Sequence, residues 1–354
     1  VTVLAIYWIA TFIAMKGIGW VGKISKWGGL IGTIIPAGLL IVLGIIYIAT
    51  GGHNYMDMQQ SFIPDLTKLD NLVLASSIFL FYAGMEMMGV HVMDINNPSR
   101  NYPKAIIIGS LATVCIFVLG TFALGVIIPA KDINLAQSLL IGFDNFFRYF
   151  HIPWAGSVIA VALMLGVLAS VLTWVAGPSK GIFTVGKAGY LPPFFQKSNS
   201  HGVQRNILLV QGGIVTLLSL LFVVMPSVQS FYQILSQLTI LLYLIMYMLM
   251  FAAAIVLRYK MKDAERPFRL GKGNALMWIL GVVGFSGSLL AFVLSFIPPG
   301  QINTGSNIVW YTVLIAGCII MVIIPLIIYA LRKPSWRDPS SEFAPFHWEN
   351  KNKE

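Results

Sequence analysis

A single glutamate, Glu86, lies inside the apolar run FLFYAGMEMMGVH at residues 79–91. A carboxylate at membrane depth costs about 2.5–3.5 kcal/mol on insertion scales, so it must face a cavity, meet a hydrogen-bond donor or be protonated. Gly84 and Gly89 flank it, and glycine lets a ligand or another backbone approach a helix closely. The stretch predicts a substrate or proton site at residues 80–89. The alternative is a protonated Glu86 that only packs against another helix.

The composition indicates which solvent surrounds this run. Of the 354 residues, 57% are hydrophobic and 10% are charged, whereas a soluble domain carries about 25% charged residues. The mean hydropathy is +0.82. A soluble protein of this size would need more polar residues to cover its surface. The chain is therefore expected to be an integral membrane protein and not a large soluble enzyme.

Nine apolar runs are candidates for membrane-spanning helices, because a spanning helix takes about 20 apolar residues. The first run is partial and the other eight are full length. None shows the period-2 alternation of a half-buried strand. The sequence therefore predicts an all-α integral membrane fold with about nine transmembrane helices. The runs cover residues 1–14, 28–49, 72–92, 105–128, 155–177, 206–225, 229–257, 274–297 and 308–331.

Basic residues gather in every second connection between these runs and in the C-terminal tail. Of the 23 lysines and arginines, only Lys68, Lys131 and Arg148 fall in the other connections. Because cytoplasmic loops are enriched in basic residues, this alternation predicts a cytoplasmic C-terminus. The net charge of +10 is attributed to the basic residues of these cytoplasmic connections, which orient the chain in the membrane. No nucleic-acid partner is expected, because no basic or aromatic reading motif is present.

Few other residues have types and spacing that could do chemistry. Cys115 and Cys318 lie in apolar runs without a CxxC or Cys/His spacing, so they predict packing and no metal site. No cofactor is expected. The runs hold no Ser/His/Asp cluster typical of a membrane enzyme and no ring of like charge typical of an ion channel. Neither an ion channel nor an enzymatic activity is therefore expected.

Two longer motifs resemble one transporter family. FYAGME followed by NPSRNYPKA, at residues 81–86 and 97–105, resembles the sixth helix and following loop of the amino acid–polyamine–organocation (APC) transporters. LGVLASVLTWVAGPSKGIFTVGKAGYLPPFF, at 165–195, resembles their eighth helix and the short cytoplasmic helix after it. FIPPGQI at 296–302 and the GPSKG stretch are most similar to the bacterial glutamate/GABA antiporters.

This resemblance implies a LeuT-like fold of five plus five helices in inverted repeats, at a bacterial inner or plasma membrane. Nine runs stand where the family has twelve helices, and the family's first three helices have no counterpart, which suggests a truncated chain. The implied parts are helices four and five at 1–49, the second repeat at 50–257 with a broken helix at 72–92 and a cytoplasmic amphipathic helix near 178–190, the last two helices at 258–331, and a cytoplasmic tail at 332–354.

The resemblance also implies where a substrate binds. In the family, carbonyl groups at the break in the sixth helix bind the substrate's ammonium group. The corresponding backbone here belongs to Leu80, Phe81, Tyr82, Ala83 and Gly84. Leu80 stands where exchangers of cationic amino acids carry an aromatic gate, which argues against an arginine-like substrate.

Four further residues are candidates for the same pathway. Trp174 matches a tryptophan of the family's eighth helix that lines the pathway, and Ser170 stands where glutamate/GABA relatives can carry a glutamate. Tyr243 and Tyr247 are four residues apart and share a helix face, and they match the region of gating tyrosines on the tenth helix. Ordinary packing is the alternative interpretation of Trp174 and of both tyrosines.

The implied function is amino acid transport by alternating access, as an antiporter of the glutamate/GABA type. The expected partners are an amino acid substrate such as glutamate or GABA, the lipid bilayer and a coupled proton carried by Glu86 or by the substrate. Three alternatives stay open: a proton-coupled symporter, a uniporter of the same superfamily, or an inert truncated fragment. No oligomeric state is assigned.

Overall fold

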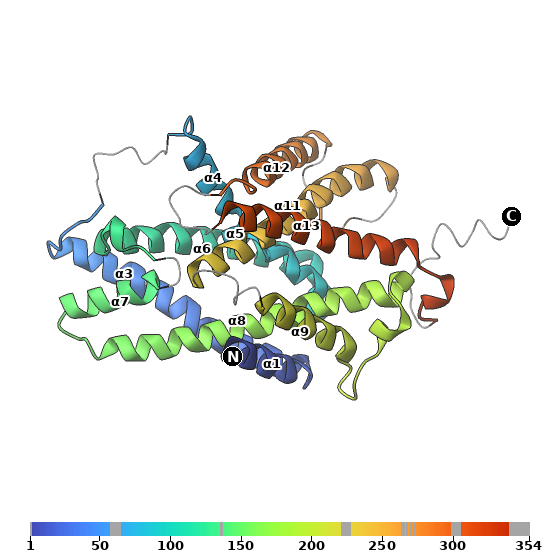
Figure 1. Cartoon of the computed structure of the whole chain (residues 1–354), viewed down its shortest axis with the longest axis horizontal. Helices are drawn as coiled ribbons and strands as arrows, with labels where there is room; N and C mark the ends of the chain where they lie inside the picture. Colours follow the sequence, from blue (N-terminus) through green and yellow to red (C-terminus); the bar gives the residue numbers. More distant parts are fainter. Residues whose placement is uncertain are drawn as a thin grey trace. The chain divides into compact units, whose positions relative to one another are not determined.

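The computed structural model describes residues 2–56, 65–134, 137–220, 228–262, 266, 268–269, 271, 273–298 and 306–339 (Figure 1). Within these ranges every regular element is a helix, which agrees with the expected all-α class. Parts of three predicted features lie outside the described residues: the end of the run 206–225, the last four residues of FIPPGQI and most of the C-terminal tail.

Six helices of the described chain are long and apolar enough to cross a membrane. Two shorter apolar helices, α1 (Thr2–Ala14) and α9 (Arg205–Ser219), account for two more of the predicted runs. The run 72–92 is the exception, because it is divided among three short elements. The six long helices are Ile18–Ala49, Pro98–Ile127, Ala155–Tyr190, Ser230–Lys260, Ala275–Leu294 and Asn307–Ala330.

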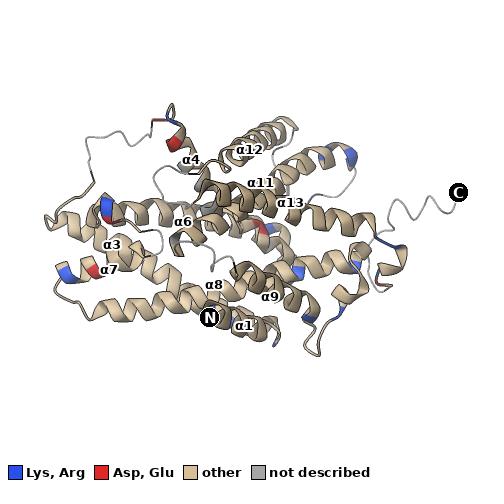
Figure 2. Ribbon diagram, viewed as in Figure 1, with Lys and Arg blue, Asp and Glu red and all other residues tan. Residues whose placement is uncertain are grey.

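Charged residues are rare along the long helices, as Figure 2 shows for α8 (Ala155–Val185) and α12 (Ala275–Leu294). α12 contains no Asp, Glu, Lys or Arg, and α8 contains only Lys180. Many large apolar side chains are exposed, among them Val283 of α12 at 65%. Exposed apolar surface on this scale suits contact with lipid and not with water. The protein is therefore a multi-pass membrane protein.

The first of two compact units comprises Val1–His53, Phe122–Val223 and Ile323–Glu354. In this unit α8 packs against α1, α2 (Ile18–Gly29), α7 (Ser138–Tyr149) and α9. The shared core contains Ala10, Ala14, Leu172, Val175 and Leu208.

One contact in this unit brings two backbones together. A five-residue π-helix, η1 (Leu30–Ile34), joins α2 to α3 (Ile35–Ala49) and crosses α8 at Gly32 and Gly166. A Cβ atom on Gly166 would lie 2.5 Å from the carbonyl oxygen of Gly32. Only glycine permits this approach, and small residues at helix crossings are typical of membrane proteins.

The second unit comprises Asn54–Thr121 and Val224–Val322. Its core joins α11 (Val228–Lys260) to α13 (Asn307–Ala330) through buried residues that include Leu241 and Trp310. The C-terminal end of α12 leaves carbonyl groups without helical partners. Gln237 donates to the carbonyl of Ser295 at 3.0 Å, and the Trp310 indole donates to the carbonyl of Phe296 at 2.9 Å.

Four elements differ from the sequence-based expectations. α2 begins at Ile18, in what was expected to be a connection, after a turn at Gly17. α6 (Pro98–Ile127) starts seven residues before the predicted run 105–128, at a proline, which suits the first helical position. α7 fills a segment expected to be a loop. α8 runs through Pro178 to Val185 and continues directly as the π-helix η4 (Gly186–Tyr190), so the predicted amphipathic helix near 178–190 is not a separate element.

Candidate functional site

The segment around Glu86 is interrupted at two points. α4 (Leu69–Ser77) is followed by a turn at Ile78, the short helix α5 (Phe79–Tyr82) and a second turn at Ala83–Gly84. The 3-10 helix η2 (Met85–Asp94) then continues the chain. A 3-10 stretch of this length is uncommon and often marks a functional hinge.

Gly84 produces the second interruption. Its φ of 104° and ψ of −7° lie in the left-handed region, which glycine adopts without steric cost. The 3-10 hydrogen bond from the Met87 N–H group to the Gly84 carbonyl at 3.1 Å then starts the new helix. The chain therefore changes direction two residues before the only acid of the predicted run.

The two carboxylate oxygens of Glu86 have different surroundings. Oε2 accepts hydrogen bonds from the Gly84 N–H group and from the Tyr247 hydroxyl, both at 3.1 Å. Oε1 is buried and has no hydrogen-bond partner among the described residues. A buried oxygen without a donor is costly, so the arrangement holds one oxygen in place and leaves the other available to a donor.

Tyr243 and Tyr247 lie together on α11, as their spacing predicted. Their ring centroids are 5.8 Å apart with an interplanar angle of 55°, and both side chains are half-buried. The pair therefore places one hydroxyl on Glu86 and a second aromatic ring beside it.

Side chains of α6 fix the other side of the interruption. The Ser110 hydroxyl donates to the Met85 sulfur at 2.9 Å, and the rings of Tyr82 and Phe117 meet edge to face with centroids 6.0 Å apart. Neither Ser110 nor Phe117 was predicted from the sequence to belong to the site. Ser110 could have been found as the single serine in an otherwise apolar run.

An apolar groove of about 590 Å³ lies beside the interruption, within the second unit. Ile78, Phe79 and Tyr82 line one side, and Tyr247, Met250 and Val283 line the other. Glu86 does not line this groove. Tyr247 borders the groove and also donates to Glu86, so it connects the groove to the carboxylate.

Leu80 and Phe81 lie on α5, and their side chains are outside the described part of the structure. Ala83 and Gly84 form the turn and are half-buried. The predicted role of this backbone in binding an ammonium group stays a prediction.

Ser170 and Trp174 lie in the first unit, on α8. Both line a pocket of about 280 Å³ that also includes Ser25, Thr33 and Thr173. The hydroxyls of Ser25 and Thr173 are 2.7 Å apart. Thr173 was not predicted from the sequence, although it lies between Ser170 and Trp174. That Ser170 and Trp174 line a substrate pathway stays a prediction.

Metal ligands do not gather in the part of the chain that the structure describes, where no group of three or more His, Cys, Asp or Glu side chains could hold an ion. Cys115 and Cys318 are free thiols.

Comparisons with known proteins identify the family of the chain. A family model described as amino acid permease matches residues 1–324. An uncharacterised transporter of Legionella pneumophila is 35% identical over 324 residues, which cover 92% of this chain and 70% of that protein. A glutamate/gamma-aminobutyrate antiporter of Lactococcus lactis is 31% identical over 344 residues, 96% of this chain and 68% of that protein. A probable agmatine/putrescine antiporter of the same species is 24% identical over 344 residues, which cover 96% of this chain and 72% of that protein.

Proposed function

Because the chain belongs to the amino acid permease family, we propose that it exchanges amino acids across the membrane by alternating access, with glutamate and GABA as the exchanged pair. The main support is the half-satisfied carboxylate of Glu86 beside the helix interruption at Gly84. The substrates proposed are those named for the Lactococcus lactis relatives that are 31% identical to this chain.

Glu86 is the proposed partner of the substrate's ammonium group. Glutamate and GABA each carry a primary ammonium, which offers three N–H donors and a positive charge. Oε1 of Glu86 is buried and lacks a donor, whereas Oε2 is already held by the Tyr247 hydroxyl and the Gly84 N–H group. A charge-assisted hydrogen bond to Oε1 would satisfy the buried oxygen. A proton on the same oxygen would compete with the ammonium, which is how transport could couple to protons.

The interruption at Gly84 is the proposed moving part. Alternating access requires that the site open to each side in turn and that the two states bind substrate differently. Broken helices at the middle of the membrane serve this purpose in secondary transporters. The 3-10 geometry of η2 is less favourable than an α-helix, so α5 and η2 can change their mutual angle at Gly84 at low cost.

Exchange is tested in proteoliposomes made with the purified chain. Vesicles are loaded with glutamate, GABA, putrescine or buffer, and uptake of each labelled compound is measured at pH 5 and pH 7. Uptake of glutamate or GABA that depends on an internal amino acid supports the proposal. Uptake that ignores the internal load would contradict exchange and favour a uniporter or symporter. Preference for putrescine would contradict the proposed substrate pair, and absence of all uptake would contradict transport by this chain.

Glu86→Gln tests the role of the carboxylate, because it keeps the shape of the side chain and removes its charge. We expect the exchange rate to fall by about tenfold or more, as for a lost charge-assisted bond of about 1.5–3 kcal/mol. Asp70→Asn is the matched control: Asp70 is exposed in the first turn of α4, and its variant should transport normally. If Glu86→Gln keeps the parent's rate and pH dependence, Glu86 only packs.

A further inference from the structure

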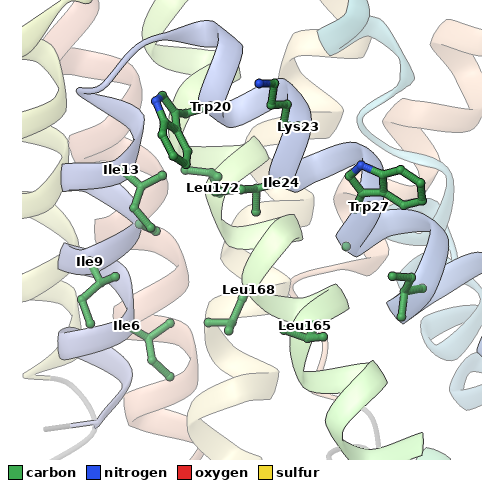
Figure 3. Close-up of a pocket in the computed structure, with 13 residues that line it drawn as sticks. Ile6, Ile9, Ile13, Trp20, Lys23, Ile24, Trp27, Leu165, Leu168 and Leu172 are labelled. Atoms are coloured by element: carbon green, nitrogen blue, oxygen red, sulfur yellow. The ribbon is translucent and has the colours of Figure 1, made fainter.

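A second groove, of about 580 Å³, lies within the first unit between α1, α2 and α8. Its walls are aliphatic: Ile6, Ile9 and Ile13 come from α1, and Leu165, Leu168 and Leu172 from α8 (Figure 3). In Figure 3, Trp20 and Lys23 of α2 lie at the end of the groove near Ile13, and Ile6 and Leu165 lie toward the opposite end. The groove therefore has an apolar length and a polar, aromatic end.

One lysine lines the groove, and two more lie beside the indoles that border it. Lys23 lines the groove between Trp20 and Trp27. The Lys16 ammonium lies 5.8 Å from the ring centroid of Trp20, and the Lys26 ammonium lies 5.7 Å from that of Trp27. Both indoles are 57% exposed. We call these five residues the lysine–tryptophan rim.

Among the described residues, no carboxylate forms an ion pair with the lysines of the rim. No Asp or Glu occurs in the sequence before Asp57. Across the described residues, no carboxylate lies within ion-pair distance of Lys16, Lys23 or Lys26; the ion pairs found there involve other basic residues, for example Arg148. Within the part of the chain that the structure describes, the rim therefore offers three positive charges that an anionic ligand could meet.

The position of the rim in the membrane follows from its residue types. Tryptophan and lysine gather at the membrane–water interface, where an indole and an ammonium both meet the lipid headgroups. The aliphatic walls then extend from headgroup level into the hydrocarbon region. A groove of this volume is within the range of small-molecule sites, about 300–1,000 Å³.

We propose that this groove binds one anionic phospholipid molecule. One of its two acyl chains lies against the isoleucines of α1 and the leucines of α8, and its phosphate is held by the lysine–tryptophan rim. The aliphatic walls would accept the acyl chain of any lipid, so selectivity comes from the lysines. Basic residues near a membrane surface attract anionic lipids by about fivefold in affinity for each lysine.

The test uses tryptophan fluorescence of the whole chain in mixed vesicles of phosphatidylcholine and phosphatidylglycerol. Bromine atoms on an acyl chain quench nearby indoles, so the brominated lipid reports which headgroup class occupies the groove. With equal mole fractions, we expect brominated phosphatidylglycerol to quench more strongly than brominated phosphatidylcholine. The excess should vanish in Trp20→Phe/Trp27→Phe, because these indoles border the groove.

Lysine variants test the source of the selectivity. Lys16→Gln/Lys23→Gln/Lys26→Gln should remove the excess quenching, and Lys23→Gln alone should reduce the preference by about fivefold. The matched control is Lys104→Gln/Lys197→Gln/Lys260→Gln, which removes the same charge from exposed positions elsewhere. It should keep the full excess.

Three results would overturn the proposal. Equal quenching by the two brominated lipids in the parent chain would show that the groove does not select anionic lipid. Equal losses in the two triple variants would assign the effect to net charge alone. An unchanged preference in Lys23→Gln would show that Lys23 does not select the lipid. This single variant is the one to use if the triple variant fails to fold.

Discussion

Replacing Gly32 with alanine tests the closest helix–helix contact of the first unit. A Cβ atom on Gly32 would lie 2.2 Å from the backbone nitrogen of Gly166 and 2.3 Å from its Cα atom. Carbon atoms pack at about 3.5–4.0 Å, so η1 and α8 would have to separate by roughly 1.2–1.7 Å at this point. No side-chain rotation relieves the clash, because the obstructing atoms belong to the backbone.

The expected loss of stability follows from two opposing contributions. Overpacking costs about 1–3 kcal/mol, and a backbone obstruction places Gly32→Ala near the upper value. In a helix interior, alanine is more favourable than glycine by about 1 kcal/mol, which offsets part of this cost. The variant should therefore be less stable than the parent by about 2 kcal/mol. Gly38→Ala, on the same long helix, is the matched control, since no heavy atom lies within 4 Å of its Cβ position; it should gain up to about 1 kcal/mol.

Unfolding by sodium dodecyl sulfate in mixed micelles, followed by far-UV circular dichroism, measures both changes. The parent midpoint should lie between those of Gly32→Ala and Gly38→Ala. Gly166→Ala should shift the midpoint in the same direction as Gly32→Ala, because its Cβ would lie 2.5 Å from the Gly32 carbonyl oxygen. If Gly32→Ala is as stable as Gly38→Ala, the two backbones are not in contact and the reasoning fails.

Two further predictions use the same unfolding measurement. Tyr247→Phe removes the hydroxyl that donates to Glu86 at 3.1 Å and should lower the free energy of unfolding by about 1–3 kcal/mol. The control Tyr232→Phe, at an exposed position of the same helix, should change it by less than about 0.5 kcal/mol. Equal unfolding midpoints for the two variants would contradict the hydrogen bond. Trp310→Phe leaves the Phe296 carbonyl without its indole donor and should cost about 1–3 kcal/mol, and an unchanged midpoint would show that this bond contributes nothing.

Apolar length and local backbone signals made much of the fold predictable. A run of about 20 apolar residues can hardly avoid being a helix in a membrane, because every backbone group must be satisfied internally. The interruption beside Glu86 could be predicted from Gly84, because it depends only on the positive φ angle of that one residue. Tyr243 and Tyr247 share a face because helical spacing alone requires it.

The helices that sequence analysis missed depend on contacts between distant segments. α7 contains Asp144 and Arg148, so it does not read as an apolar run, but its buried Phe143 and Phe146 fix it against neighbouring helices. Pro178 does not end α8, because nearby hydroxyl groups and packing can satisfy the backbone around a proline in a membrane helix.

Contacts in the site between residues far apart in the sequence could not be predicted from local sequence patterns. The hydroxyl that holds Glu86 belongs to Tyr247, 161 residues away, and nothing in the sequence distinguishes it from Tyr243. Ser110, which meets Met85, was detectable only as a polar residue in an apolar helix. Spacing identifies which side chains share a helix face, whereas packing between helices selects the one that makes the bond.

The π-helix at Leu30–Ile34 affects how this chain should be aligned with its relatives. A wider turn accommodates one extra residue, and each residue of an α-helix advances the helical wheel by about 100°. A relative with regular α geometry here would require a one-residue gap in the middle of a transmembrane segment, where alignments normally forbid gaps. Deleting one residue from this turn would rotate one flank relative to the other and move Gly32 away from Gly166, so the extra residue determines which side chains of the flanking helix face α8.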